Sequence, residues 1–346
     1  MATYEGGDPD DWDVMRHNQN NVQSGNNAGW IALRDLVNQS SGTYVQTQAG
    51  YDAVKQVLDV ENLCDYMIMN LFTGFSYDWP GSNWYSADDR ATPGAKWKMY
   101  SWDAEHSLKD VNQNSTGFST NGSPARLYHR LRQNEEFKVL FGDRVHRSFF
   151  NGGPLYVNPQ SPAWDPQNPQ NNRPAALYAQ LANEIEDGII MESARWGDAF
   201  VTSGPPYTLD NFWMVERDRI LNQYFPQRAG IVLNQFRNID LYPNVDAPVF
   251  SQHGGTVPAG FTLTASGPAG GTIWYTLDGS DPRLQGGAVS GAAQTWIGPV
   301  TLIQSTTVKA RTLVGNDWSA LNEAPFLVEG ISVNELLAKN VNGIVD

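Results

Sequence analysis

The sequence is poor in cysteine, in positive charge and in long apolar runs. Cys64 is the only cysteine among 346 residues, which excludes an intrachain disulfide and a zinc site built from cysteines. Its neighbours on an expected helix are mostly apolar, so we expect a buried and unreactive thiol. No stretch approaches the roughly 20 apolar residues that a membrane-spanning helix needs, so no membrane partner is expected. The first residues also lack the basic and apolar segments of a secretion signal.

Basic residues are outnumbered by acidic ones. The chain has 23 Lys and Arg against 37 Asp and Glu, a formal net charge of -14, and no basic run. Because proteins bind nucleic-acid phosphates with clustered Lys and Arg, a nucleic-acid partner is not expected. Hydrophobic residues make up 40% of the chain, enough for globular cores, and its length favours two domains.

Helical patterns fill residues 1–245, whereas residues 246–329 have short alternating runs typical of strands. Asp59 is expected to cap a helix over 59–74, and Ser123-Pro124 to begin a helical pattern that ends at Gly152-Gly153. Further helices are predicted over 174–196, 209–224 and 229–237, and strands over 261–265, 272–277, 300–303 and 307–312. The fold class is therefore α+β: a mainly helical domain with a small β-hairpin, followed by an all-β, immunoglobulin-like sandwich.

The segment 75–108 carries the polar residues with the clearest chemical pattern. Asp78 is followed five residues later by Asn83, then by two strand-like runs, and Asp103 comes directly after the second run. A β-hairpin here would bring these three residues to one of its ends. Phosphoryl transfer needs such a set, because one carboxylate orients the acceptor hydroxyl while an amide oxygen and another carboxylate hold Mg²⁺. By spacing alone, a polar loop in which Asp78 and Asn83 cap turns is the more common arrangement.

Other motifs favour the phosphoryl-transfer site over the polar loop. They are Asn70-Leu71-Phe72, Asp78-x4-Asn83-Trp84-Tyr85, Trp102-Asp103-x-Glu105, Glu136-Phe137, and the segments 123–127, 141–145 and 192–198. Together they resemble the CotH kinase family of atypical protein kinases, first known from spore coats. The resemblance covers residues 4–243.

The resemblance implies a protein-kinase-like fold that transfers phosphate from ATP to Ser or Thr of an exported or coat protein. Asp78 would be the catalytic base, Asn83 a ligand of Mg²⁺ or Mn²⁺, and Asp103 the principal metal-binding aspartate, so that Asn83 and Asp103 also bind the nucleotide. Glu105 is a further metal-ligand candidate. The family usually has Asp where Glu105 stands, which puts the metal role of Glu105 in doubt.

A kinase also needs a strand-borne Lys for the ATP phosphates and a Glu that holds this Lys. Before Asp78 the only basic residues are Arg16, Arg34 and Lys55, and none lies in a strand pattern typical of a nucleotide-clamping sheet. We therefore expect that the N-terminal ATP lobe is missing and that the isolated chain can be inactive.

Several other polar residues are expected to have structural rather than catalytic roles. These are a hydrogen-bonded or surface position for His17, solvated helix faces for His129 and His146, bidentate pairing with site carboxylates for Arg126 and Arg195, and a solvated acidic surface for Asp10, Asp11 and Asp13. His106 is close enough to Asp103 in sequence to contact substrate, although this is the less common role for such a residue.

Residues 246–329 resemble the C-terminal domain of chitobiases and β-hexosaminidases. The resemblance rests on 271–282, GTIWYTLDGSDP, and on Val308-Lys309-Ala310-Arg311. Three tryptophans of this module, Trp274, Trp296 and Trp318, could stack on sugar rings, but core packing is the more common role, at least for Trp274. Residues 330–346 look like the start of a lamin-tail-like domain.

Two classes of function follow. The first is a kinase fragment from an exported, modular parent, extracellular or at the cell surface, whose partner is a protein with a Ser or Thr acceptor. The alternative is a non-catalytic cell-surface or glycan-associated scaffold. Metal-dependent ATP binding separates them. A glycoside hydrolase is not supported, because no pair of catalytic carboxylates in a barrel pattern is present.

Overall fold

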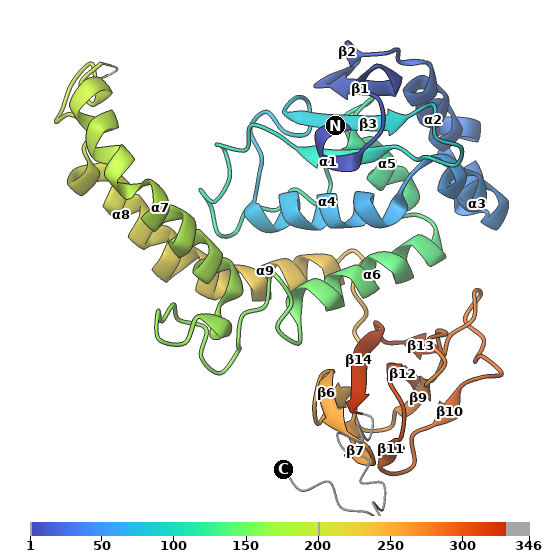
Figure 1. Ribbon diagram of the computed structural model, residues 1–346. Coiled ribbons are helices and arrows are strands. Elements are labelled where there is room, and N and C mark those ends of the chain that lie inside the picture. The colour runs from blue at the N-terminus through green and yellow to red at the C-terminus, as the bar shows by residue number, and fades with distance from the viewer. Residues whose placement is uncertain (1, 200, 330–346) are drawn as a thin grey trace, which may run out of the picture. The chain divides into compact units, whose positions relative to one another are not determined.

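The computed structural model describes residues 2–199 and 201–329. The chain divides into two compact units, residues 1–244 and 245–346 (Figure 1). The first is mainly helical with one sheet, and the second is built from strands, so the predicted α+β class is confirmed. The lamin-tail prediction for 330–346 lies outside the described residues. None of the helices in the described ranges is both long and apolar enough to span a bilayer.

The first unit contains a four-stranded antiparallel sheet in the order β2-β1-β3-β4. Its strands are β1 (Trp12–Arg16), β2 (Asn18–Ser24), β3 (Trp84–Asp89) and β4 (Lys98–Ser101). The predicted hairpin of β3 and β4 is therefore present, but it is half of a larger sheet. The expectation that none of Arg16, Arg34 and Lys55 lies in a strand pattern fails for Arg16, which ends β1. The strands before Asp78 gave little signal, because β2 is mostly Asn and Gln and β1 is too short to show a period of two.

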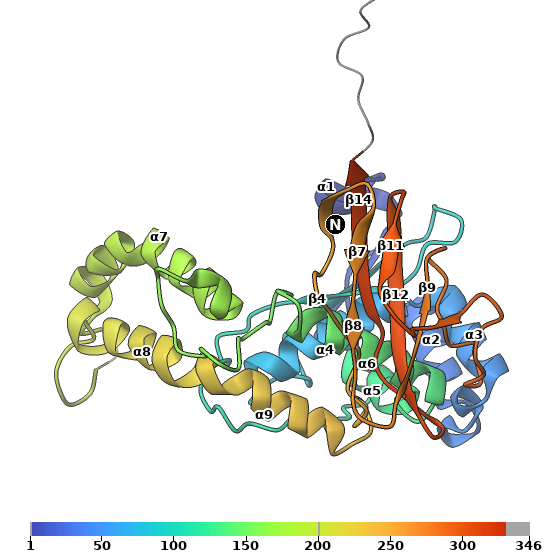
Figure 2. The ribbon, with the colours of Figure 1, turned by 90° about the horizontal axis from the view of Figure 1, so that it is seen from below.

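Helices cover this sheet and extend beyond it. They are α1 (Ala2–Glu5), α2 (Ala28–Asn38), α3 (Gln48–Val57), α4 (Val60–Thr73), α5 (Pro124–Leu131), α6 (Glu135–Phe149), α7 (Arg173–Trp196), α8 (Met214–Arg219) and α9 (Phe225–Arg237). Short 3-10 segments are Pro9–Asp11, Gln39–Gly42, Tyr44–Gln46 and Pro169–Asn171, and π-helical turns flank α8 at Leu209–Trp213 and Ile220–Tyr224. Figure 2 shows α7 running beside the helical segment that contains α8, where Arg217 pairs with Glu186.

The helix α4 packs on the sheet and leads into the segment that carries Asp78. Asp59 caps its start by accepting a hydrogen bond from the Asn62 amide at 2.9 Å, as predicted. Asn62 also exchanges two hydrogen bonds with the backbone of Met99 on β4, at 2.6 and 3.3 Å. Cys64 on this helix is fully buried, which agrees with the expected unreactive thiol.

The predicted helical pattern between residues 123 and 153 is two helices rather than one. Asn134 separates α5 from α6, because its side chain accepts hydrogen bonds from the amides of Glu136 and Phe137 and so starts a new helix. Ser123 stands at the predicted N-cap position, but its hydroxyl donates to the Thr120 carbonyl instead of capping α5.

The second unit has a five-stranded path, β10-β9-β12-β14-β6, to which β13 adds by pairing with β12. Two smaller two-stranded sheets, β11-β7 and β5-β8, complete this unit. Its strands are β5 (Val249–Phe250), β6 (Gly255–Pro258), β7 (Phe261–Leu263), β8 (Ala265–Ser266), β9 (Thr272–Thr276), β10 (Gln294–Thr295), β11 (Val300–Leu302), β12 (Thr306–Val314), β13 (Asp317–Trp318) and β14 (Asn322–Glu329). β6 and β14 are parallel, and the other pairs are antiparallel.

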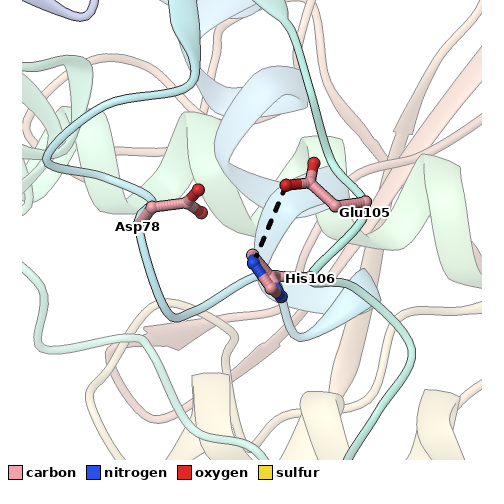
Figure 3. A group of neighbouring side chains, drawn as sticks. All are labelled: Asp78, Glu105 and His106. Atoms are coloured by element: carbon pink, nitrogen blue, oxygen red, sulfur yellow. Dashed lines mark ion pairs between the residues drawn. The ribbon is translucent and has the colours of Figure 1, made fainter. Parts of the chain in front are cut away.

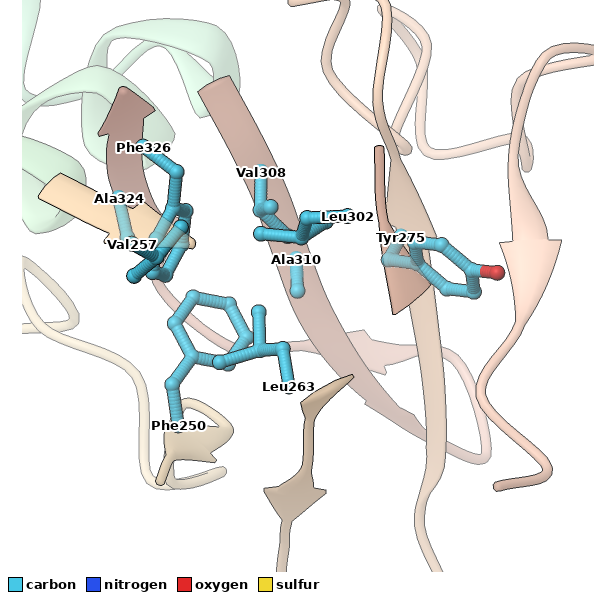
Figure 4. Packing of buried hydrophobic residues seen from close by; sticks show 9 residues of the cluster. All are labelled: Phe250, Val257, Leu263, Tyr275, Leu302, Val308, Ala310, Ala324 and Phe326. Atoms are coloured by element: carbon cyan, nitrogen blue, oxygen red, sulfur yellow. The ribbon is translucent and has the colours of Figure 1, made fainter. Parts of the chain in front are cut away.

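The core of this unit lies between the main sheet and the smaller pairs β11-β7 and β5-β8 (Figure 4). It consists of Phe250, Val257, Leu263, Tyr275, Leu302, Val308, Ala310, Ala324 and Phe326. Trp296 packs against this core beside Tyr275, with ring centroids 4.7 Å apart. Arg311 on β12 forms an ion pair with Asp281. Arg311 is 1% exposed, and both oxygens of Asp281 accept from its guanidinium at 2.8 and 2.6 Å.

Candidate active site

The loop 74–83 is held at its start by the C-terminal end of α4. Gly74 adopts a φ of 65°, and a Cβ atom there would lie 3.1 Å from the Tyr224 hydroxyl, so glycine suits this position. Arg228, which is completely buried on α9, donates to the carbonyls of Phe72 at 2.7 Å and of Leu71 and Val111 at 2.5 Å. These bonds satisfy helix-end carbonyls and fix the point from which the loop departs.

Aromatic side chains anchor the middle of the same loop. Phe75 and Trp79 are buried and their rings stack with centroids 6.0 Å apart, while the Trp79 indole donates to the Tyr66 hydroxyl at 2.8 Å. Asp78 directly precedes this buried tryptophan. The packing of Phe75 and Trp79 therefore fixes the course of the backbone around Asp78.

The sheet brings three further polar residues to one of its ends. Arg16 at the end of β1 pairs with Tyr85, and Trp84 at the start of β3 pairs with Ser101 at the end of β4. The residues just beyond these strand ends are His17, Asn83 and Asp103. The His17 amide continues the ladder by donating to the Trp84 carbonyl at 3.1 Å.

Asn83 connects the candidate residues. It is 4% exposed, and its amide nitrogen donates to Asp78 Oδ2 at 2.7 Å and to the Asp103 carbonyl at 3.1 Å. Within the described residues no group donates to Asn83 Oδ1, so this oxygen is available as a ligand. The structure thus brings Asp78, Asn83 and Asp103 together as the hairpin geometry predicts.

The backbone at this end of the sheet is unusual. His17, Asn83 and Asp103 have φ values of 61°, 59° and 53°, in the left-handed region that L-residues rarely adopt. Such conformations cost about 1–3 kcal/mol each and are concentrated at functional sites. Three of them on adjacent strand ends indicate that side-chain placement here is maintained against backbone preference.

The two carboxylates differ in environment. Asp103 is exposed, whereas Asp78 is partly buried, and its Oδ1 is a buried atom without a hydrogen-bond partner in the described part of the chain. His17 lies close to both. Burial, followed by the charge of Arg16, lowers the pKa of His17, although Asp103 and Asp78 act in the opposite direction. This agrees with the hydrogen bonding of His17, because its Nδ1 accepts from the backbone N–H of Asn83 at 3.4 Å.

Glu105 and His106 approach Asp78 from the segment after β4 (Figure 3). One ligand atom from each of the three residues lies within 4.8 Å of the others, and His106 Nε2 is 3.7 Å from Glu105 Oε1. The Tyr77 ring packs on the His106 ring with centroids 4.5 Å apart. Glu105 is therefore beside Asp78, and His106 is part of the site, although sequence reasoning gave it a minor role.

Several predicted supporting residues have other partners. Arg126 bonds Asn38 and Ser119, and Arg195 lies over the Trp196 ring at 5.0 Å, so the predicted pairing of both with site carboxylates is wrong. His146 is buried rather than solvated, because its ring packs against the rings of Phe150 and Tyr242.

Two charged residues of β1 are also placed differently from expectation. Asp13 is 4% exposed and pairs with Arg90 at 2.9 Å, so it does not belong to a solvated acidic surface. Arg16 does lie on a strand, with its guanidinium over the rings of Tyr85 and Trp102 at 5.5 and 5.4 Å. The aromatic residues of 84–102 were the only sequence signal for such a contact.

Two family models match parts of the chain. Residues 2–150 match the family model described as CotH kinase protein, and residues 261–319 match the model described as Fn3 associated. No curated protein and no solved structure matches the chain. The first match includes Asp78, Asn83, Asp103 and Glu105, and it supports a kinase-like role for the first unit. The chitobiase-type assignment of the second unit stays a prediction.

Proposed function

We propose that the first unit transfers a phosphoryl group from ATP to a Ser or Thr hydroxyl of a protein, with Asp78 as the base that orients the acceptor. The observation that carries this proposal is the Asn83 side chain, which joins the Asp78 carboxylate to the backbone of Asp103. A kinase needs these groups in one place, because the acceptor and the metal-bound phosphates react with each other. The match of this region to a kinase family supports the same reaction.

The donor set suits Mg²⁺ or Mn²⁺ on the nucleotide. These hard ions prefer oxygen ligands, and the site offers Asn83 Oδ1, which accepts no hydrogen bond within the described chain, and the exposed Asp103 carboxylate. Bound there, the ion would neutralise phosphate charge. Asn83 can serve this ion with its oxygen while its nitrogen keeps Asp78 in place.

Asp78 has the geometry required of a base. Asn83 occupies its Oδ2, whereas its Oδ1 is without a partner among the described residues and can accept the proton of an incoming hydroxyl. Burial and the charge of Arg16 lower the pKa of His17, which disfavours a charged imidazolium beside the site.

The cellular setting extends the proposal. A Ser- or Thr-containing exported or surface protein is the acceptor class that fits a kinase domain combined with a β-strand module in an extracellular or cell-surface parent. In this setting the second unit would contact protein or glycan.

The test is calorimetric titration of the full chain with ATP, with and without Mg²⁺ or Mn²⁺, followed by a phosphotransfer assay on Ser- and Thr-containing proteins. We expect metal-dependent binding that is lost in Asp103→Ala and retained in Asp78→Ala. Transfer should fall about 10²–10⁴-fold in Asp78→Ala, the usual contribution of a positioned base. Asp52→Ala removes a partly exposed carboxylate on α3 that pairs with Lys55; it is the matched control and should behave as the wild type.

The outcomes separate the two classes of function. Absence of metal-dependent ATP binding would contradict a nucleotide site formed by this chain alone and would favour the scaffold alternative for it. A large loss of ATP binding in Asp78→Ala would contradict the separation between the acceptor carboxylate and the metal ligands.

A further inference from the structure

Asp78, Glu105 and His106 form a second set of possible ligands at the candidate active site (Figure 3). We propose that they bind a transition-metal ion such as Zn²⁺ or Co²⁺, separately from the Mg²⁺ position at Asn83 and Asp103. The set combines one imidazole with two carboxylates, whereas Asn83 and Asp103 supply oxygen only. Imidazole ligands suit zinc, cobalt and similar ions, while Mg²⁺ prefers oxygen.

The spacing of the three residues suits one ion after a small adjustment. In a tetrahedral zinc site with metal–ligand distances of about 2.0–2.1 Å, neighbouring ligand atoms are about 3.3 Å apart. Here the ligand atoms lie within 4.8 Å of one another, and His106 Nε2 is 3.7 Å from Glu105 Oε1. The Glu105 side chain is 55% exposed, so it can rotate toward the ion without disturbing the core.

The other two ligands are held before an ion binds. The buried Trp79 and the hydrogen bond from Asn83 fix Asp78, and its unpartnered, buried Oδ1 is a donor atom that no contact within the described residues uses. The Tyr77 ring packs on the His106 imidazole. Prepositioned ligands reduce the entropy that metal binding must overcome.

Lys109 opposes the ion in the present arrangement. Its ammonium group contacts His106 Nδ1, which leaves Nε2 facing Glu105. A metal bound to Nε2 requires the proton on Nδ1, and an ammonium group cannot accept a hydrogen bond from that proton. Metal binding must therefore displace Lys109, whose exposed side chain is free to move into solvent.

The consequence for activity rests on the proposed function. An ion on Asp78 would engage the carboxylate that the acceptor hydroxyl needs, so Zn²⁺ should inhibit phosphotransfer. Since the two metal positions use different ligands, excess Mg²⁺ should not fully reverse this inhibition. Metal binding itself does not depend on whether the chain is a kinase.

The test is a Co²⁺ titration of the full chain followed by visible absorption, with a Zn²⁺ competition to give its affinity. We expect a single site, and His106→Ala should lower its Co²⁺ affinity by at least about tenfold. Loss of a group that only hydrogen-bonds to a metal ligand already costs about this much affinity. Lys109→Met should bind more tightly than the wild type, because it removes the competing ammonium group. His129→Ala, on α5 and outside the three-residue group, is the matched control and should be unchanged.

Two results would overturn the proposal. One is Co²⁺ affinity that is the same in His106→Ala and in the wild type. The other is affinity that depends on Asp103 and not on His106, which would place the ion in the Mg²⁺ position and leave the proposed kinase site intact. Should His106→Ala fail to fold by circular dichroism, Lys109→Met decides: tighter binding supports the site, and unchanged affinity refutes it.

Discussion

Arg228 should be a main determinant of both stability and site geometry, although it lies on α9, far in sequence from the loop it supports. Its guanidinium donates to the carbonyls of Leu71, Phe72 and Val111 and is completely buried. Replacement by Met removes all three donors while keeping much of the side-chain volume. The end of α4, and with it the start of the loop that carries Asp78, then loses its support.

The expected loss of stability depends on which hydrogen bonds each of the three carbonyls keeps. The Phe72 carbonyl still accepts from the Tyr224 hydroxyl at 2.9 Å, and the Leu71 carbonyl keeps a long contact of 3.3 Å with the Gly74 amide. Val111 is partly exposed, so water can replace its donor. At about 1 kcal/mol for each hydrogen bond lost, we expect Arg228→Met to lower the free energy of unfolding of the first unit by about 3 kcal/mol.

A charge-preserving variant tests the geometry. Lys keeps the positive charge but not the planar set of donors, so Arg228→Lys should lose part of this stability. Denaturation of the full chain by urea gives both values, and the second unit, which has its own core, serves as an internal reference. A free energy of unfolding for Arg228→Met within about 0.5 kcal/mol of the wild-type value would refute the reasoning, because that is the usual range of a neutral surface substitution.

Two further predictions concern other parts of the molecule. Asp281→Ala should destabilise the second unit by about 3 kcal/mol, at the lower end of the range for breaking a buried pair because Asp281 keeps 35% exposure, and an unchanged urea midpoint would contradict this. His17 should titrate below 6.5 in an NMR pH series, because burial and Arg16 lower its pKa. Since the unfolded chain then binds this proton more readily, the stability from His17 is present above pH 6.5 and lost below it; a midpoint above 6.5 would refute the assignment.

Local sequence rules predicted much of what positions the site. The cap at Asp59 and the apolar spacing of 60–71 predict α4, and the runs around 84–102 predict the hairpin of β3 and β4. Antiparallel pairing then requires that the residue before one strand and those after the other lie at the same end. For this reason Asn83 and Asp103 could be brought together from sequence alone.

Contacts between segments that are distant in sequence could not be predicted from the sequence. β2 is recognisable only through its pairing with β1, because its asparagines and glutamines carry no strand signal. Arg228 resembles any basic residue of an amphipathic helix until α9 is placed against the end of α4. His146 was expected in solvent for the same reason, since the rings that bury it include one 96 residues away.

Asp78 lies between the two proposed metal positions, which would allow one to control the other. Its Oδ2 belongs to the Asn83 network, whereas its Oδ1 faces no partner among the described residues, so one carboxylate can serve the acceptor or a transition metal but not both through that oxygen. Lys109 biases the choice, because its ammonium contacts the imidazole nitrogen that must carry a proton when His106 binds a metal. Lys109 in place thus favours the metal-free carboxylate that the proposed phosphoryl transfer requires, and removal of Lys109 should move the same site toward metal binding and inhibition.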